Sequence, residues 1–363
     1  MACQSLSPGA SSKSVENITA PSWTADMKTL QVNLAEIEPF LYDSTLFNAP
    51  KNQDILKEKI HLLAVTSKNI NHNPTIINRD PTVRFIASQF SQNLQKVEQS
   101  FRSGKTEYAR YQLMKVTSSC VHCHTRIQQG PEFTTKTSEV FLKNMPKVDQ
   151  AEYLIASRRF DEAYDILLKV LETPETDNIF SWSSDKAAGL ALLVAVQYKQ
   201  NYKQALKIVR LIEYNKSLPY YLKTKANNWK QSIDAWIGEK KKPTSIPEMR
   251  ALLENGKSEI EAMRVIPGIL KLLSMDQAPQ QLGESLLLAG ESYELINDIL
   301  PMEIHENYYE SCIKNVPHSP ISKKCYKRLE ESIKIGYSGS SGTNIPVEVE
   351  IWLNKLKEES EKF

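Results

Sequence analysis

A five-residue motif near the end of the first third of the chain dictates local structure more strongly than any other segment. Residues 120–124 read Cys-Val-His-Cys-His. In a helix, Cys120, Cys123 and His124 are related as i, i+3 and i+4, so their side chains project from one face. The two thiols can bond the two vinyl groups of a haem, and the imidazole can ligate its iron. The motif therefore predicts a helix here, with one covalently attached haem c.

Three other interpretations of the motif stay open. A zinc site would need further ligands, and Cys312 and Cys325 are remote in sequence and spaced by 13 residues. A thioredoxin-like redox pair would need a βαβ setting, which the sequence lacks. The two cysteines could also be ordinary helix residues without a ligand.

Composition narrows the range of functions. Lys and Arg total 45 and Asp and Glu total 43, a net charge of +2 that gives no support for nucleic-acid binding. Only 12 glycines occur, and no glycine-rich phosphate-binding motif is present. No apolar run approaches the ~18 residues of a transmembrane helix. No nucleophile–base pair with a recognisable local context is visible, so we do not expect an enzyme. A chain of 363 residues suggests two or three domains.

Hydrophobic periodicity predicts an all-α protein. Residues 1–22 are polar and rich in serine, which is typical of a flexible tether. Residues 23–129 show apolar residues at helical spacing and predict a domain of four helices. We expect Pro39 to stop the first helix. The expected helices are about 24–38, 52–71, 81–102 and 106–128.

The second half of the chain is helical and weakly repetitive. After a linker at 130–146 with one short turn of helix, residues 147–335 carry an aromatic-x-x-Ala-x-x-Ile pattern at Phe160 and again at Tyr202. The pattern resembles the second helix of tetratricopeptide repeats, although the offset is 42 residues rather than 34. A third unit is expected at 285–315, and irregular helical packing is the alternative. Residues 336–363 predict a loop followed by a final helix.

The four helices ending in the Cys120–His124 motif resemble the cytochrome c-prime group of four-helix-bundle cytochromes. Asn-Ala-Pro before the second helix and a Ser-Gly turn before the fourth support this resemblance. Ile127 and Gln128 depart from the group, which often has Tyr and then Arg or Lys there. The resemblance implies a haem bundle, with His124 as the proximal ligand and a distal residue from the first helix.

Met27 is the candidate distal ligand, because the low-spin members of the group are Met-ligated. The alternative is a core methionine, with Leu30 or Leu34 facing a five-coordinate iron. His61 and His72 are weaker candidates for the distal position. The haem propionates need cationic or polar partners, for which the candidates are Lys28, Arg79 and Arg84.

The remaining cysteines bear on cellular location. Cys312 and Cys325 flank a turn between two helical patterns, which favours a disulfide over two buried thiols. Cys3 follows Ala2 in a pattern that resembles the end of a lipoprotein cleavage box, so it is a lipidation candidate; a stray terminal thiol is the alternative. A disulfide and a c-type haem both point outside the cytosol. We expect a periplasmic or otherwise extracytoplasmic protein, anchored through lipid at Cys3 and exported from a precursor with a signal peptide.

The leading functional hypothesis is a monohaem c-type cytochrome that transfers single electrons. Its helical repeats would dock a protein redox partner or a membrane-associated complex, and the resemblance adds a weak expectation of a homodimer. The first alternative is a five-coordinate haem protein that binds or senses a small gas such as NO or CO. The second is a structural or assembly subunit of a larger complex.

Overall fold

A computed structural model of the chain describes residues 23–72, 81–124, 142–143, 145–174, 182–239, 241–256, 258–300, 303–340 and 342–361. These residues are almost entirely helical, which confirms the all-α class. Their only strands are β1 (Ser338–Gly339) and β2 (Gly342–Thr343), which form a short antiparallel pair in the segment expected to be a loop. No described helix is both long enough and apolar enough to cross a membrane.

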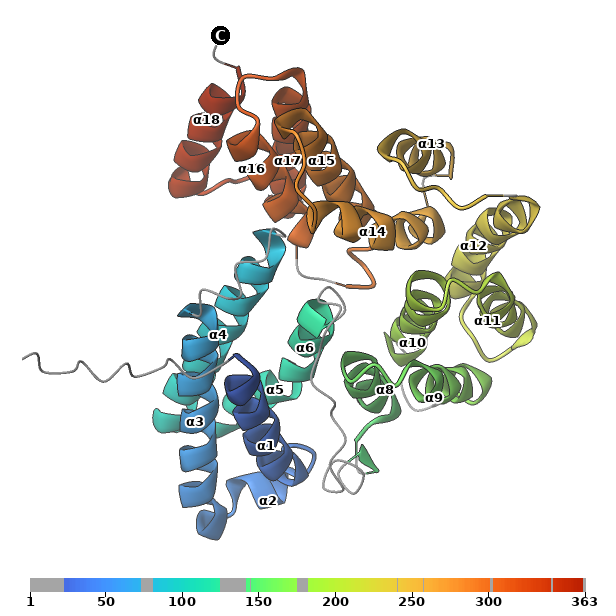
Figure 1. The fold of residues 1–363 in the computed structure, drawn as a ribbon. Helices are drawn as coiled ribbons and strands as arrows, with labels where there is room; N and C mark the ends of the chain where they lie inside the picture. Colours follow the sequence, from blue (N-terminus) through green and yellow to red (C-terminus); the bar gives the residue numbers. More distant parts are fainter. Residues whose placement is uncertain are drawn as a thin grey trace, which may run out of the picture.

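The first group of helices, called here the N-terminal helices, spans α1 to α6. Its long element α3 packs against α1 and α4, and α4 packs in turn against α5 and α6 (Figure 1). Apolar residues at helical spacing on α3 and α4, such as Leu56, Ile60, Leu94 and Val97, are buried between them. The elements are α1 (Trp23–Leu41), α2 (Ser44–Asn48), the 3₁₀ turn η1 (Pro50–Asn52), α3 (Gln53–His72), α4 (Pro81–Arg102), α5 (Thr106–Met114) and α6 (Val116–His124).

Two details of this group differ from the expected helices. Pro39 lies inside α1, which continues for only two residues beyond it, to Leu41, so the hydrogen bond that the proline cannot make is lost from the last turns of the helix alone. The expected helix at 106–128 is divided at Lys115, whose N–H donates to the carbonyls of Gln112 and Leu113 and so closes a tighter turn. Residues 125–141, which include the end of that helix and most of the linker, lie outside the described ranges.

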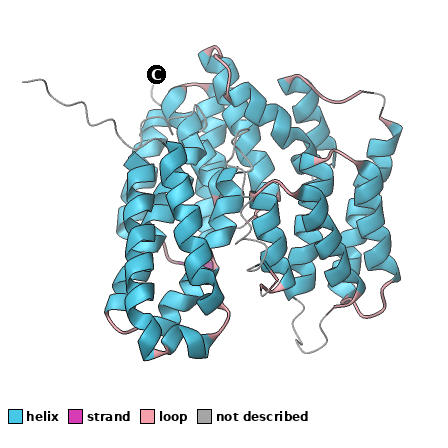
Figure 2. Ribbon diagram, turned by 60° about the horizontal axis from the view of Figure 1, so that its bottom comes forward, coloured by secondary structure: helices cyan, strands magenta, loops and turns pink. Residues whose placement is uncertain are grey.

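The second group, called here the C-terminal array, consists of helices that pack chiefly on their neighbours in the chain (Figures 1 and 2). In place of one helix, residues 182–198 form α10 followed by a π-helical segment, η3. The elements are α8 (Lys147–Ala156), α9 (Phe160–Glu172), α10 (Trp182–Leu192), η3 (Leu193–Tyr198), α11 (Tyr202–Tyr214), α12 (Tyr220–Gly238), α13 (Ile246–Gly256), α14 (Glu259–Leu273), α15 (Pro279–Leu295), α16 (Ile304–Asn315), α17 (Pro320–Gly336) and α18 (Val347–Glu361).

The sequence pattern that recurs after 42 residues has a recurring backbone. Helices α9 and α11 begin at its aromatic residues, Phe160 and Tyr202, and each is 13 residues long. Two residues before each start, Arg158 and Gln200 have φ angles of 62° and 49° in the left-handed region. Each first aromatic also contacts another ring: Phe160 stacks on Tyr198, and Tyr202 meets Trp236 edge-on. The two segments are therefore equivalent in structure as well as in sequence.

The array returns to the N-terminal helices at its first helix and again near its C-terminal end. Helix α8 packs on α6, and α16 packs on α4 (Figure 1). At the second contact the buried hydroxyls of Thr82 and Tyr308 lie 3.5 Å apart, although 226 residues separate them in the chain. The helices thus form a closed circuit of packing contacts rather than an open row.

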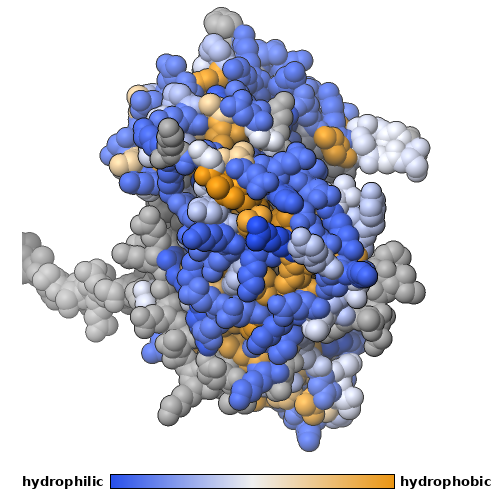
Figure 3. All heavy atoms as spheres, turned by 90° about the vertical axis from the view of Figure 1, so that its right-hand side faces the viewer, coloured by the Kyte–Doolittle hydropathy of each residue, from blue (hydrophilic) through white to orange (hydrophobic). Residues whose placement is uncertain are grey.

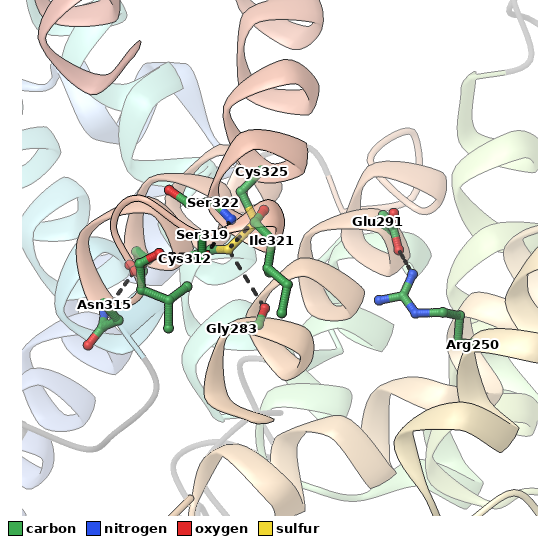
Figure 4. The surroundings of a disulfide bond; sticks show 11 residues. Arg250, Gly283, Glu291, Cys312, Asn315, Ser319, Ile321, Ser322 and Cys325 are labelled. Atoms are coloured by element: carbon green, nitrogen blue, oxygen red, sulfur yellow. Dashed lines mark hydrogen bonds and ion pairs between the residues drawn. A yellow bond between two sulfur atoms is a disulfide. The ribbon is translucent and has the colours of Figure 1, made fainter. Parts of the chain in front are cut away.

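Helices α16 and α17 form a hairpin joined by a disulfide between Cys312 and Cys325 (Figure 4). The two Cα atoms lie 6.2 Å apart, within the usual range for such bonds. Ser319 caps α17 by accepting a hydrogen bond from the N–H of Ser322. The backbone N–H of His318 donates to the carbonyl of Glu359, which ties the turn to α18.

Candidate functional site

The Cys120–His124 motif forms the last turn of α6, between α4 of the N-terminal helices and α8 of the array. Cys123 and His124 are buried, and Cys120 is half-buried. Their i, i+3 and i+4 spacing on a regular helix directs the three side chains to one side.

A small apolar cavity lies against this face of α6. It is lined by Cys120, Cys123 and His124 together with Met27 of α1. The remaining lining residues are Leu30, Ile70, Ile86, Ala87, Phe90 and Ser119. The cavity therefore gathers two thiols, an imidazole and a thioether inside walls that are otherwise almost wholly hydrocarbon.

This set of side chains fits a covalently bound haem in its chemistry. Thiols for thioether bonds, imidazole and thioether as iron ligands, and apolar walls around a macrocycle are all present. The cavity itself is about 40 Å³, whereas pockets for small molecules begin at roughly 300 Å³. To admit a macrocycle, the side chains of Leu30, Ile86 and Phe90 would have to move apart. The groups that must move are therefore side chains and not backbone.

His124 is oriented by the C-terminal array. Its Nδ1 lies 3.1 Å from the carbonyl oxygen of Ala156, the last residue of α8. A carbonyl only accepts hydrogen bonds, so Nδ1 carries the proton and Nε2 carries the lone pair. Metal-ligating histidines usually donate their second ring N–H in this way, which fixes both tautomer and ring orientation.

The surroundings of His124 also keep its ring neutral. The side chain is 6% exposed, and this burial lowers its pKa to about 4. The hydrogen bond to Ala156 opposes the shift, and the positive charge of Arg158 adds to it. A neutral imidazole at neutral pH is the form that can bind a metal.

Arg158 is a second contact from the array to the motif. Arg158 lies between α8 and α9, and its backbone has a left-handed conformation. Its Nη2 donates to the carbonyl oxygen of His124 at 3.2 Å. A cation therefore stands at the C-terminal end of α6, where the helix dipole favours positive charge. The sequence departs from the c-prime pattern at Ile127 and Gln128, and both residues lie outside the described ranges. Arg158 brings a positive charge to the end of α6 from a separate helix pair, α8 and α9.

The other residues proposed from the sequence fall into three groups. Met27 and Leu30 line the cavity, and Leu34 is not among its lining residues. His61 instead pairs with Glu98 on the exposed surface of α3, and Lys28 and Arg84 are exposed. Cys3, Arg79 and the side chain of His72 lie outside what the structure describes.

The described residues provide no set of ligands for a zinc centre, which was an alternative interpretation of the motif. Within the described ranges, no group of three or more His, Cys, Asp or Glu side chains is arranged to hold a metal ion. Cys312 and Cys325 are bonded to each other in the α16–α17 hairpin.

Sequence reasoning missed Ala156 and Arg158. Ala156 contributes a backbone carbonyl, which leaves no mark in side-chain identity, and both residues are more than 30 positions from His124. The only available signal was the turn implied before the Phe160 repeat, and it did not indicate which helix the turn would meet.

The chain was compared with protein-family models, with curated protein sequences and with solved structures, and none of the three comparisons gave a match.

Proposed function

We propose that this chain is an extracytoplasmic monohaem c-type cytochrome that transfers single electrons. In this proposal α1, α3, α4 and the α5–α6 pair act as a c-prime-like four-helix bundle that holds the haem. The C-terminal array acts as a tetratricopeptide-like solenoid that docks a partner protein.

The observation that carries the proposal is the convergence of residues from separate helices on one cavity. Cys120, Cys123 and His124 line it from α6, and Met27 lines it from α1. Cysteine attachment, a histidine ligand and a methionine ligand together are the set used by electron-transferring cytochromes.

Each residue has a distinct role. Cys120 and Cys123 would form the thioether bonds, and His124 and Met27 would be the axial ligands. A bound haem supplies the one-electron change between iron states. Ala156 keeps the proton of His124 on Nδ1, which leaves the lone pair on Nε2. The hydrocarbon walls would exclude water from a bound haem and favour the less charged iron state.

A five-coordinate haem that binds a small gas is the second candidate. Leu30 lines the same cavity as Met27 and lies three residues further along α1, nearly one turn away. A leucine over the iron would leave the sixth position without a protein ligand. The role of Met27 is therefore the point on which the two functions divide.

The disulfide between Cys312 and Cys325 supports an extracytoplasmic location, because such bonds persist in oxidising compartments. An acyl anchor at Cys3 would hold the protein at a membrane. Docking by the array follows from the general behaviour of stacked helix pairs, which present extended surfaces to other chains.

Visible absorption spectroscopy of protein exported in a host competent for c-type maturation tests the proposal. Spectra would be recorded in the oxidised, reduced, and reduced carbon-monoxide states. We expect low-spin bands that do not respond to carbon monoxide, and a high-spin, carbon-monoxide-sensitive spectrum in Met27→Ala. The matched control is Met114→Ala, which removes a half-buried methionine that does not line the cavity.

A high-spin spectrum in the unaltered protein would transfer the proposal to gas binding. Protein that retains no haem after denaturation would refute both candidates. An unchanged spectrum in Met27→Ala would remove Met27 as a ligand while leaving covalent attachment in place.

A further inference from the structure

The near balance of charge over the whole chain conceals one strongly basic segment. Residues 199–242, which include α11 and α12, contain eleven lysines and arginines and only three acidic residues. The rest of the chain must therefore carry a net negative charge, since the whole chain has a net charge of +2.

Three of these cations form a stripe on α11. Lys203, Lys207 and Arg210 are spaced by four and three residues, so they lie on one face of the helix, and all three are exposed. The opposite face, with Ala205, Ile208, Val209 and Ile212, is buried. Among the ion pairs of the described residues, none involves a residue of this stripe, whereas Lys225 and Lys230 of α12 pair with Asp185 and Glu213.

Tyrosines extend the stripe at the C-terminal end of α11. Tyr214 continues the spacing of the cations and is 80% exposed. Tyr220 and Tyr221 begin α12 and are 84% and 47% exposed, and the exposed Lys216 lies between them and Tyr214. Figure 3 views the side of the molecule that carries α11 and α12, and its surface is mostly hydrophilic with scattered apolar strips.

We propose that the stripe of Lys203, Lys207 and Arg210, with the tyrosines at its end, binds the headgroups of an anionic phospholipid bilayer. Lysine and arginine near such a surface are attracted by its negative potential, and tyrosine is favoured at headgroup level, where its ring is buried and its hydroxyl stays hydrated. The site is the outward face of a helix, which meets a flat surface more readily than an extended peptide. It is independent of the haem and of the residues around it.

An acidic protein is the competing occupant, because it offers the same charge. A protein partner would present carboxylates at fixed positions and no interfacial layer into which tyrosine can insert. The exposure of three tyrosines beside the cations is therefore the observation that favours the bilayer.

Vesicle co-sedimentation of the full chain tests this proposal. A Cys3→Ser background prevents an acyl chain from contributing to binding. Mixed vesicles of phosphatidylglycerol and phosphatidylcholine are compared with phosphatidylcholine alone, and soluble polyglutamate is offered at the same total charge. We expect binding to the mixed vesicles only, weakened by salt over the range in which the Debye length falls below ~10 Å.

Two variants and one control separate the contributions. Lys203→Gln/Lys207→Gln/Arg210→Gln should weaken vesicle binding about a hundredfold, since each cation near the surface contributes ~1 kcal/mol. Tyr214→Ser/Tyr220→Ser should weaken it by roughly tenfold through lost apolar burial. The control Lys51→Gln/Lys57→Gln/Lys96→Gln removes three exposed lysines of the N-terminal helices and should leave binding unchanged.

Equal loss in the control and in the stripe variant would refute a specific site. Binding to polyglutamate as strong as to vesicles, with no effect of the tyrosine variant, would refute the bilayer and identify an acidic protein as the occupant. No preference for anionic over neutral vesicles would refute the proposal outright. Circular dichroism of each variant checks that the helices are intact, and surface substitutions of this kind should leave them so.

Discussion

The core of α10 and η3 in the C-terminal array and the interior beside α6 in the N-terminal helices differ in chemistry. Every residue from Ala187 to Val196, along α10 and η3, is buried, and apart from Gly189 each has a hydrocarbon side chain. The interior beside α6 instead gathers Cys120, Cys123, His124 and Met27 around a cavity. The core of α10 and η3 is therefore hydrocarbon, whereas the interior beside α6 also holds two thiols, an imidazole and a thioether.

The contrast shows how two kinds of interior meet within one chain. Dense hydrocarbon packing gives a rigid frame, because interiors of this kind resist small displacements. That frame ends at Ala156, whose carbonyl holds His124. The C-terminal array thereby orients the imidazole of His124, which belongs to the N-terminal helices.

The largest expected effect comes from removing the reactive groups. Cys120→Ala/Cys123→Ala should abolish covalent haem entirely, because no thiol of the motif remains to form a thioether bond. Mass spectrometry of the denatured protein measures retained haem. The control is Cys312→Ala/Cys325→Ala, which also removes two cysteines but should leave the haem attached; haem lost from the control alone would contradict the assignment of haem attachment to Cys120 and Cys123.

Next in size is the loss of a packing residue from the array. Leu167→Ala in α9 should lower the free energy of unfolding by about 2–5 kcal/mol, since Leu167 is fully buried in a dense interior. Leu30→Ala should cost less, because Leu30 already borders a cavity and its removal creates fewer new unfilled contacts. Urea unfolding of haem-free protein, followed by circular dichroism, compares the two. Equal costs would mean that the two interiors do not differ in packing.

Removal of the disulfide should have an effect of similar or smaller size, confined to the array. Cys312→Ser/Cys325→Ser opens a cross-link between residues 13 apart and should lower the free energy of unfolding by roughly 3 kcal/mol. Thermal unfolding by circular dichroism detects the loss, while the haem absorption spectrum at room temperature should not change. A changed spectrum would mean that the hairpin and the motif are more tightly coupled than their contacts indicate.

The smallest expected effect distinguishes the two equivalent turns of the repeat. Gln200→Gly should stabilise the protein by up to about 1 kcal/mol, because glycine adopts a positive φ without steric cost and the hydrogen bond that is lost, from Nζ of Lys242 to Oε1 of Gln200, is exposed to solvent. Arg158→Gly relieves the same strain but loses the hydrogen bond to the carbonyl of His124, so we expect no net gain. Thermal unfolding of the two variants side by side measures the difference. An equal gain at both positions would show that Arg158 contributes nothing to α6.

Much of the helical framework could be predicted from residue type. Pro81 begins α4, and the aromatic residues Phe160 and Tyr202 begin α9 and α11, because prolines and repeated apolar patterns act locally. The break at Lys115 and the π-helical segment η3 left no such signal, since both keep helical periodicity on either side. The motif residues of the candidate site were visible in sequence.

The environment of the motif was not visible, for a physical reason. The contact between His124 and Ala156 depends on how α8 packs against α6, and that packing arises from surfaces distributed over many residues. Cys312 and Cys325 were easier, because both lie in one hairpin and their pairing needs only a local turn. Local chemistry could therefore be read from the sequence, and the meeting of distant helices could not.

The closed circuit of helices has a consequence for the order in which the chain can open. An open row of helix pairs frays from its ends, since a terminal pair touches only one neighbour. Here α16 is held by α4, so it cannot separate from the N-terminal helices without breaking contacts between residues more than 200 positions apart. Amide hydrogen exchange should therefore be slow in α8 and in α16 alike, and the segments that exchange first should lie in the middle of the circuit, around α13, rather than at its ends.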